Sequence, residues 1–388
     1  MITRRLASTV SVSVPPTDTA PRKIVLVGAG FLGSYIAKAL VADPRNRVLL
    51  VSRNPQKLHS KLSHLGSQIL PPHSTDLTSS SASSSLRDAF KDASAVVSMV
   101  GLLTGSEKTM DLVQRQGTER VAEAAREEGV KRVVGISAIG ADEGGITPYW
   151  RTKALGEKAI LENHPTGTII RPSIVFGPGD SFFNRFAILA KYLPFLPVFG
   201  GGVVRFQPVY AGDIARAVEI CCRDDEEVVR QVGGRIIEAG GPDVFTYREI
   251  MQLVLRYSGL EGRRAILSLP YWVGTMQGLV LEKLPENIFT LTRDQVAQLR
   301  SDNIVSPSPP LNSLSFQALL SAFPSSLPTS SPPGEAGLTS VEKVLPTYLG
   351  DQSREAGKRT HGRRSSDAPG AFEDVKRMSS GKDKGGRS

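Results

Sequence analysis

The sequence predicts an α/β protein built on a doubly wound parallel sheet of the Rossmann type, followed by a smaller C-terminal α/β region. The first observation is an apolar run, Ile24 to Val27, that stops at three glycines spaced G-x-G-x-x-G: Gly28, Gly30 and Gly33. The second is that further short apolar runs alternate with segments of helical spacing as far as residue 177. Strands that alternate with helices favour a parallel sheet covered on both faces.

Composition narrows the class of protein. Of the 388 residues, 40% are hydrophobic, which is enough for a large core, and no uncharged apolar run reaches the ~18 residues of a membrane span, so we expect a soluble or peripheral protein. The net charge of +9 lies mostly at the two ends of the chain, and aromatic residues do not interleave with it, so nucleic-acid binding is not expected. The two cysteines, Cys221 and Cys222, are adjacent and are typical of buried residues in a reducing compartment.

Shifts in composition predict the domain boundaries. Residues 1–23 carry Arg4 and Arg5, many Ser and Thr, and no acid before Asp18, which favours a mitochondrial presequence over a plain disordered terminus. We expect a dinucleotide-binding domain at 24–177, a substrate or partner region at 178–305, a Pro/Ser-rich linker without lasting regular structure at 306–334, a short helical segment at 335–349 and a disordered basic tail at 350–388.

The glycine run predicts a strand, a tight turn and a helix that continues to Leu40. One glycine permits the turn, one lets the backbone approach a pyrophosphate, and one lets the helix pack on the strand. The phosphates would lie on the free N–H groups of the first helical turn, which Phe31, Leu32 and Gly33 supply. Because the chain has 37 glycines, an ordinary glycine turn is the alternative.

The next strand, Arg47 to Val51, ends in Ser52 and Arg53. A site specific for NAD usually has an acid here that binds the ribose 2′-hydroxyl, whereas a guanidinium suits a 2′-phosphate. The sequence therefore favours NADP(H). NAD(H) stays possible, since Arg53 in solvent would have no such role.

The remaining elements follow the same alternation. We expect a third strand near Ser67–Leu70, a Ser-rich surface loop over Ser79–Ser85 and a short helix from Leu86. After these come strands at 95–101, 132–136 and 167–172, helices at 108–128 and 149–163, and, beyond 178, helices at 182–192, 211–223, 247–258, 292–300 and 339–349 with short strands at 205–209 and 236–239.

The segment Ile266–Leu281 has sixteen residues and no charge. It is interrupted by Pro270 and by two glycines, and it is short for a membrane span. We expect it to be buried against the sheet. Contact with a membrane surface or a hydrophobic partner is the alternative.

Three residues form a candidate catalytic set. Tyr149 and Lys153 are four apart and project from one helix face, and Ser137 follows the preceding strand, so its side chain can point into the same crevice. The ammonium of Lys153 would lower the pKa of the phenol and hold the nicotinamide ribose, Tyr149 would act as general acid or base, and Ser137 would orient a substrate oxygen. A surface Tyr and Lys on an amphipathic helix is the alternative.

With the glycine turn, these three residues resemble the extended and atypical short-chain dehydrogenase/reductase superfamily. The later blocks Arg171–Arg185 and Arg205–Ala215 support the superfamily. A third block, Leu291–Val296, with its weaker companion Val344–Leu349, narrows the resemblance to the NAD(P)H-binding accessory subunit family of respiratory complex I over about residues 24–349.

The resemblance implies which residues contact the cofactor. Gly28, Gly30 and Gly33 would hold the pyrophosphate, although the first glycine of the superfamily's usual G-x-x-G-x-x-G falls at Val27 here. The resemblance also implies that Ser52 and Arg53 contact the adenosine ribose or its 2′-phosphate, that Asp76 and Leu77 flank the adenine, that Val100 and Gly101 line the ribose, and that Pro172, Ser173 and Ile174 face the nicotinamide.

Two functions follow. The first is a non-catalytic or weakly catalytic NADPH-binding protein that stabilises respiratory complex I at the matrix side of the mitochondrial inner membrane. The second is an NADP-dependent oxidoreductase or epimerase-like enzyme, one version of which would act in a coenzyme Q (quinone-synthesis) assembly; the intact Ser137, Tyr149 and Lys153 set favours it. We prefer the first because of the resemblance.

Overall fold

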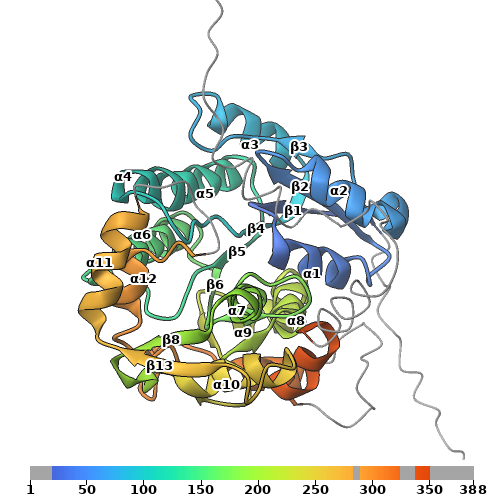
Figure 1. Cartoon of the computed structure of the whole chain (residues 1–388). Helices are drawn as coiled ribbons and strands as arrows, with labels where there is room; N and C mark the ends of the chain where they lie inside the picture. Colours follow the sequence, from blue (N-terminus) through green and yellow to red (C-terminus); the bar gives the residue numbers. More distant parts are fainter. Residues whose placement is uncertain (1–19, 283–288, 324–336, 350–388) are drawn as a thin grey trace, which may run out of the picture.

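A seven-stranded parallel sheet lies at the centre of the computed structural model, which describes residues 20–282, 289–323 and 337–349 (Figure 1). The strand order is β11-β6-β5-β4-β1-β2-β3, so it reverses between β1 and β4, and ligands of such sheets bind at that point. The predicted fold class is confirmed. The strands are β1 (Arg22–Val27), β2 (Asn46–Ser52), β3 (His73–Ser74), β4 (Ala93–Ser98), β5 (Arg132–Ile136), β6 (Thr168–Pro172) and β11 (Ile236–Ala239).

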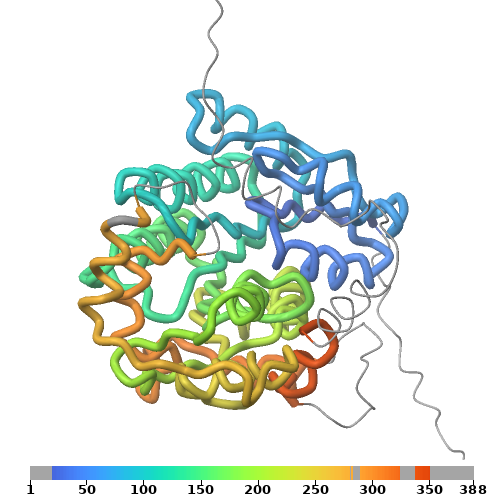
Figure 2. Tube along the Cα trace, viewed as in Figure 1, coloured from blue at the N-terminus to red at the C-terminus, as the bar shows by residue number. Residues whose placement is uncertain are grey.

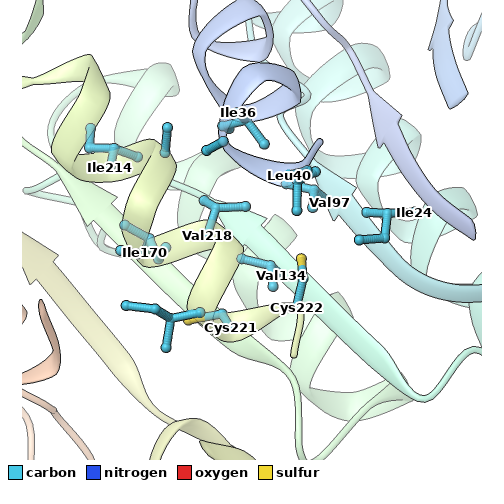
Figure 3. Close-up of a cluster of buried hydrophobic side chains, with 14 of the residues drawn as sticks. Ile24, Ile36, Leu40, Val97, Val134, Ile170, Ile214, Val218, Cys221 and Cys222 are labelled. Carbon is cyan, nitrogen blue, oxygen red and sulfur yellow. The ribbon is translucent and has the colours of Figure 1, made fainter. Parts of the chain in front are cut away.

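Both faces of the sheet are buried, which explains why its strands are apolar runs rather than alternating ones. On one face Ile24 and Leu26 pack under α1 (Phe31–Leu40) and α8 (Ala211–Cys221), in the cluster drawn in Figure 3. On the other face Val25 and Val27 pack with residues of α3 (Ala82–Phe90), α5 (Gly117–Glu127) and α6 (Pro148–Asn163).

The adjacent cysteines end α8 and are buried (Figure 3), as the sequence predicts. Burial raises the pKa of both thiols, that of Cys222 to about 12, so neither is a ready nucleophile. Arg22, at the amino end of β1, donates to the carbonyl oxygen of Cys222, and Arg132, at the amino end of β5, donates to that of Cys221. These carbonyl oxygens at the end of the helix thereby gain hydrogen-bond donors.

A second region packs around its own apolar cluster, with helices α7 (Phe182–Tyr192) and α10 (Tyr247–Tyr257). The helix at 341–349, red in Figure 2, lies against it through Val341, Leu345 and Leu349. Three strand pairs complete the region: β7 (Val175–Phe176) with β10 (Val209–Tyr210), β9 (Arg205–Phe206) with β12 (Phe245–Thr246), and β8 (Phe195–Phe199) with β13 (Ala265–Leu269).

The other described elements are short. They are α2 (Gln56–Leu62), α4 (Glu107–Met110), α9 (Glu226–Val232), α11 (Tyr271–Leu281), α12 (Arg293–Gln298) and α13 (Phe316–Ala322), with 3₁₀ turns at Ser63–Gln68 and Gly200–Gly202 and a π-helical turn at Asp111–Gln116.

Two expectations near β3 are wrong. Residues Ser63–Gln68 form a 3₁₀ turn, only Ile69 makes an isolated bridge to Val48, and the third strand lies at His73–Ser74. The Ser-rich loop ends earlier than expected, because α3 begins at Ala82 and buries that residue with Leu86. The helix forms there because burying its apolar face outweighs the weak helix preference of serine.

The expectation that Ile266–Leu281 is buried against the sheet is also wrong. Pro270 separates β13 from α11, and β13 pairs with β8 instead of the central sheet. Helix α11 turns its glycines inward: a Cβ on Gly274 would lie 2.7 Å from the ring of Phe199, and one on Gly278 would lie 2.9 Å from the backbone nitrogen of Arg293. Three of its large side chains face outward, with Trp272, Met276 and Leu279 exposed by 67%, 57% and 40%. None of the described helices is long and apolar enough to cross a membrane.

The segment expected as an unstructured linker contains α13, so that expectation is wrong for Phe316–Ala322. Ser315 caps the helix by accepting the N–H of Ala318, and Phe316, Leu319 and Leu320 are buried in the cluster beside α8. The predicted presequence, apart from residues 20–23, and the basic tail lie outside the described residues.

Candidate functional site

The glycine turn leaves β1 and enters α1 at the point where the strand order reverses. Gly28 has a φ of +77°, and a Cβ there would lie 3.0 Å from the carbonyl oxygen of Met99, so a side chain is excluded on both counts. Gly33 packs closely, because its Cβ position lies 2.9 Å from the Cβ of Ala29.

Gly30 is different, because no heavy atom of the residues that the structure describes lies within 4 Å of its Cβ position. It is the N-cap of α1 and makes no side-chain capping bond, and the first helical turn holds no acid. The N–H groups of Phe31, Leu32 and Gly33 therefore meet open space at the positive end of the helix, which fits a dinucleotide pyrophosphate.

The adenosine end of the site would lie beyond β2 and β3. Ser52 is half-buried and Arg53 is exposed, and the carbonyl oxygen of Arg53 accepts the hydroxyl of Ser74 at 3.0 Å. Asp76 is exposed as well; hydrogen bonds from the Thr78 N–H and hydroxyl, with a smaller effect of the Arg53 charge, lower the pKa of its carboxyl. The ends of the two strands thus bring Arg53 and Asp76 near each other.

Leu77, next along the chain, is half-buried against α5. The Cβ position of Gly117 lies 3.4 Å from the Leu77 side chain, and the Leu77 carbonyl oxygen accepts a hydrogen bond from Arg120. Contacts with Gly117 and Arg120 of α5 therefore fix the position of Leu77, next to the exposed Asp76.

Lys153 of α6 joins the carboxyl ends of β4 and β5. Its Nζ donates to the carbonyl oxygen of Val100 at 2.9 Å and to that of Ile136 at 3.2 Å. The Cβ position of Gly101 lies 3.0 Å from the same Nζ, so any larger residue at 101 would displace the ammonium. Burial lowers the pKa of Lys153 to about 8, although the Glu157 charge opposes the shift.

Ser137 and Tyr149 are placed differently from each other. Ser137 is buried, its N–H donates to the Ile170 carbonyl oxygen at 2.8 Å, and its Oγ has no hydrogen-bond partner within the described protein. Tyr149 is half-buried in the first turn of α6, and burial raises its pKa to about 12. Ser137 and Lys153 line one cavity of about 20 Å³, whereas Tyr149 does not.

Pro172 ends β6, and Ser173 and Ile174, which follow it, are anchored by the second region. The Ser173 hydroxyl is directed at Asn303, 2.8 Å from its carbonyl oxygen and 2.6 Å from its Oδ1. The carbonyl oxygen of Ile174 accepts the N–H of Val209 at 2.9 Å. The Ser173 hydroxyl is engaged by Asn303, and Ser173 is buried. Ile174 is half-buried, so of these two residues its side chain is the more accessible to a ligand.

Gln114 lines the same cavity as Ser137 and Lys153 and is absent from the residues predicted by sequence. It lies in the π-helical turn, is 1% exposed, and donates from Nε2 to the Thr152 hydroxyl at 3.2 Å. Its Oε1 is buried and has no hydrogen-bond partner in the part of the chain that the structure describes. A helical spacing that runs through Gly117, Val121 and Ala125 places Gln114 on the buried face, and that signal is present in the sequence. The cavity has room for about one water molecule, which would satisfy these atoms.

Glu157 is a second buried residue that sequence analysis omitted. It lies one turn after Lys153 and forms a two-bond ion pair with Arg171, at 2.9 and 2.7 Å. Arg171 in turn lies 3.9 Å from Glu238 of β11. This pairing ties α6 to the sheet directly behind the ammonium.

Comparison with known proteins agrees with this geometry. Residues 28–177 match the family described as NAD(P)H-binding. The chain is 29% identical over 312 residues to the mitochondrial NADH dehydrogenase (ubiquinone) 1 alpha subcomplex subunit 9 of Arabidopsis thaliana, covering 76% of this chain and 72% of the relative. It is 30% identical over 199 residues to the protein of that name from Mus musculus, covering 51% of this chain and 50% of the relative.

Among solved structures, dTDP-glucose 4,6-dehydratase from Streptomyces venezuelae, which holds NAD, superposes with a TM-score of 0.55 at 18% identity. The match covers 74% of this chain and 93% of that protein, and at this identity it shows the fold alone. Nicotinamide-dinucleotide binding by this chain thus follows from the matched family and agrees with the open glycine turn. Residues 28–177 thus match the NAD(P)H-binding family, and the chain is similar to the subunit 9 proteins of mitochondrial complex I.

Proposed function

We propose that this chain is a mitochondrial NADP(H)-binding protein that serves as an accessory or assembly and stability factor of respiratory complex I. The observation that carries the proposal is the glycine turn, whose open space at Gly30 and uncapped helix N-terminus fit a pyrophosphate. The relatives named as complex I subunits give the partner.

The end of β2 supports NADP(H) over NAD(H). Arg53 is exposed directly after the strand, and neither Ser52 nor Arg53 is the acid that would bind a ribose 2′-hydroxyl. The guanidinium of Arg53 forms no side-chain ion pair with the described residues, so it can pair with a 2′-phosphate.

The hydrogen bonds of Lys153 and the pKa of Tyr149 support a structural rather than a catalytic role for the cofactor. A bound nicotinamide supplies hydride transfer, and this requires a proton donor or acceptor of suitable pKa beside it. Here Lys153 donates to two backbone carbonyl oxygens, and burial alone shifts the pKa of Tyr149, upward to about 12. Such a phenol is a poor base near neutral pH.

The outward stripe of α11, formed by Trp272, Met276 and Leu279, supports attachment to a larger assembly. Three large apolar side chains on successive turns of one helix favour contact with a hydrophobic partner or a membrane surface. We place this contact at the matrix side of the inner membrane, in keeping with a complex I accessory role.

The test is complementation of mitochondria that lack this chain. The full chain is expected to co-migrate with complex I and restore its amount, Tyr149→Phe to do so equally well, and Gly30→Val, whose side chain fills the pyrophosphate space, to fail. Gly144→Val is the matched control, because Gly144 lies in an exposed loop and, among the described residues, its Cβ position meets only the Asp142 carboxylate, at 3.7 Å. Failure of the chain to co-migrate with complex I would refute the proposal.

The second candidate is an NADP-dependent oxidoreductase or epimerase-like enzyme, including one in a quinone-synthesis assembly. The unpartnered Ser137 hydroxyl and the Lys153 pKa of about 8 favour it. Loss of rescue by Tyr149→Phe, in a variant that folds and retains NADPH, would establish this function instead.

A further inference from the structure

The buried carboxylate of Asp180 lies where the helix at 341–349 meets the turn that follows β7. It is 4% exposed and accepts N–H groups from Phe183 at 2.7 Å, Gly177 at 3.2 Å and Asn184 at 3.3 Å. The hydroxyl of Tyr348, from the helix at 341–349, donates to the same carboxylate. One acid therefore fixes both the turn at 177–180 and the last described residues of the chain.

The opposite side of this turn lies on α1. The Tyr35 hydroxyl donates to the carbonyl oxygen of Pro178 at 3.1 Å, and the Cβ position of Gly177 lies 2.9 Å from that hydroxyl oxygen. The Cβ position of Gly179 lies 3.7 Å from the ring of Phe31, and the rings of Phe31 and Tyr35 meet edge to face at 5.3 Å. The turn thus contacts the first residue of α1, whose N–H belongs to the predicted pyrophosphate site.

The helix at 341–349 has a second anchor at its start. Asp213 of α8 is 3% exposed and accepts the Thr339 N–H at 2.7 Å and the Thr339 hydroxyl at 3.1 Å. This anchor and the buried Val341 and Leu345 hold the segment when the Tyr348 hydroxyl is removed, so that hydroxyl can be tested without unfolding the segment.

We propose that Tyr348 is a positioning residue of the dinucleotide site, so that cofactor binding and the seating of the helix at 341–349 are thermodynamically coupled. The coupling runs from Tyr348 through Asp180 and the turn at 177–180 to Phe31 and Tyr35 of α1. It rests on the proposed function in one respect, that the ligand of the turn is NADP(H). Because such coupling is reciprocal, the cofactor stabilises the docked helix to the same extent as the docked helix strengthens cofactor binding.

The test uses the full chain and NADPH titrations followed by calorimetry. Tyr348→Phe is expected to raise the Kd about three- to tenfold, the range for loss of one ordinary hydrogen bond. Tyr192 is 69% exposed at the end of α7, and Tyr192→Phe is expected to leave the Kd unchanged. Tyr35→Phe removes a hydrogen bond on the other side of the same turn. The Kd of the double variant Tyr348→Phe, Tyr35→Phe for NADPH is expected to rise by less than the product of the two single fold-increases.

Hydrogen exchange of residues 337–349 gives a second readout. NADPH is expected to slow exchange there in the wild-type chain and to slow it less in Tyr348→Phe. Wild-type affinity in Tyr348→Phe, with exchange of 337–349 unaffected by NADPH, overturns the coupling and leaves the proposed function intact. Absence of NADPH binding by the wild-type chain overturns both.

Discussion

The Nζ of Lys153 lies 2.9 Å from the carbonyl oxygen of Val100, and this hydrogen bond joins α6 to the loop that follows β4. The same ammonium donates to Ile136, so a buried positive charge is held by two backbone dipoles. Glu157, whose charge raises the pKa of Lys153, forms an ion pair with Arg171. The lysine is therefore part of the architecture of the site before any ligand is present.

Lys153 makes stability depend on pH in a defined window. Its pKa is about 8 in the folded protein against 10.5 ordinarily, so between these values the unfolded chain binds more protons and the free energy of unfolding rises with pH. The cost of burying the charge is fully present below pH 8. Relative to Lys153→Met, the wild-type chain is expected to gain about 3 kcal/mol between pH 7 and pH 10.5, measured by urea unfolding at each pH. A difference that stays constant with pH would contradict the assigned shift.

Two glycines of one turn should respond in opposite ways to the same added methyl group. In Gly28→Ala the new residue has to adopt a positive φ, and its Cβ lies close to the Met99 carbonyl oxygen. We therefore expect the free energy of unfolding to fall by about 1–3 kcal/mol. Gly30→Ala meets open space, so we expect little change in stability and a weaker affinity for the dinucleotide. Chemical denaturation and NADPH titration of both variants separate the two effects; equal destabilisation by both would show that the turn is described wrongly.

The cofactor preference can be measured at Arg53. Arg53→Ala is expected to weaken NADPH binding about tenfold and to leave NADH binding nearly unchanged, because only NADPH carries the phosphate that a guanidinium would pair with. Lys61→Ala, an exposed cation of α2, serves as the control for general charge. Equal losses for both nucleotides at Arg53 would remove the argument for NADP(H).

The outward stripe of α11 is expected to serve association rather than folding. Changing Trp272, Met276 and Leu279 together to Gln should shift the melting temperature little, since these side chains already face solvent, and should reduce co-migration with complex I. Leu311 is a fully exposed apolar residue before α13, and Leu311→Gln is the control. Full co-migration of the triple variant would exclude this face as the contact.

Much of the central fold could be predicted because its signals are local. Central strands such as β1 and β2 contain continuous apolar runs, and the glycine turn carries its own backbone requirements, such as the positive φ of Gly28. Nicotinamide-dinucleotide binding and the burial of Cys221 and Cys222 were predicted from the same kind of evidence and are confirmed.

What the sequence by itself determined is therefore the alternation of elements, the dinucleotide turn and the similarity to NAD(P)H-binding proteins. Only the tertiary structure decided which face of α11 points outward, because that depends on how closely Gly274 and Gly278 approach Phe199 and Arg293. It likewise decided that α13 forms, that Gln114 shares a cavity with Ser137, and that Tyr348 reaches Asp180, 168 residues earlier in the chain. The physical reason is that strand and helix patterns repeat within a few residues, whereas burial and pairing between distant segments follow from packing the whole chain.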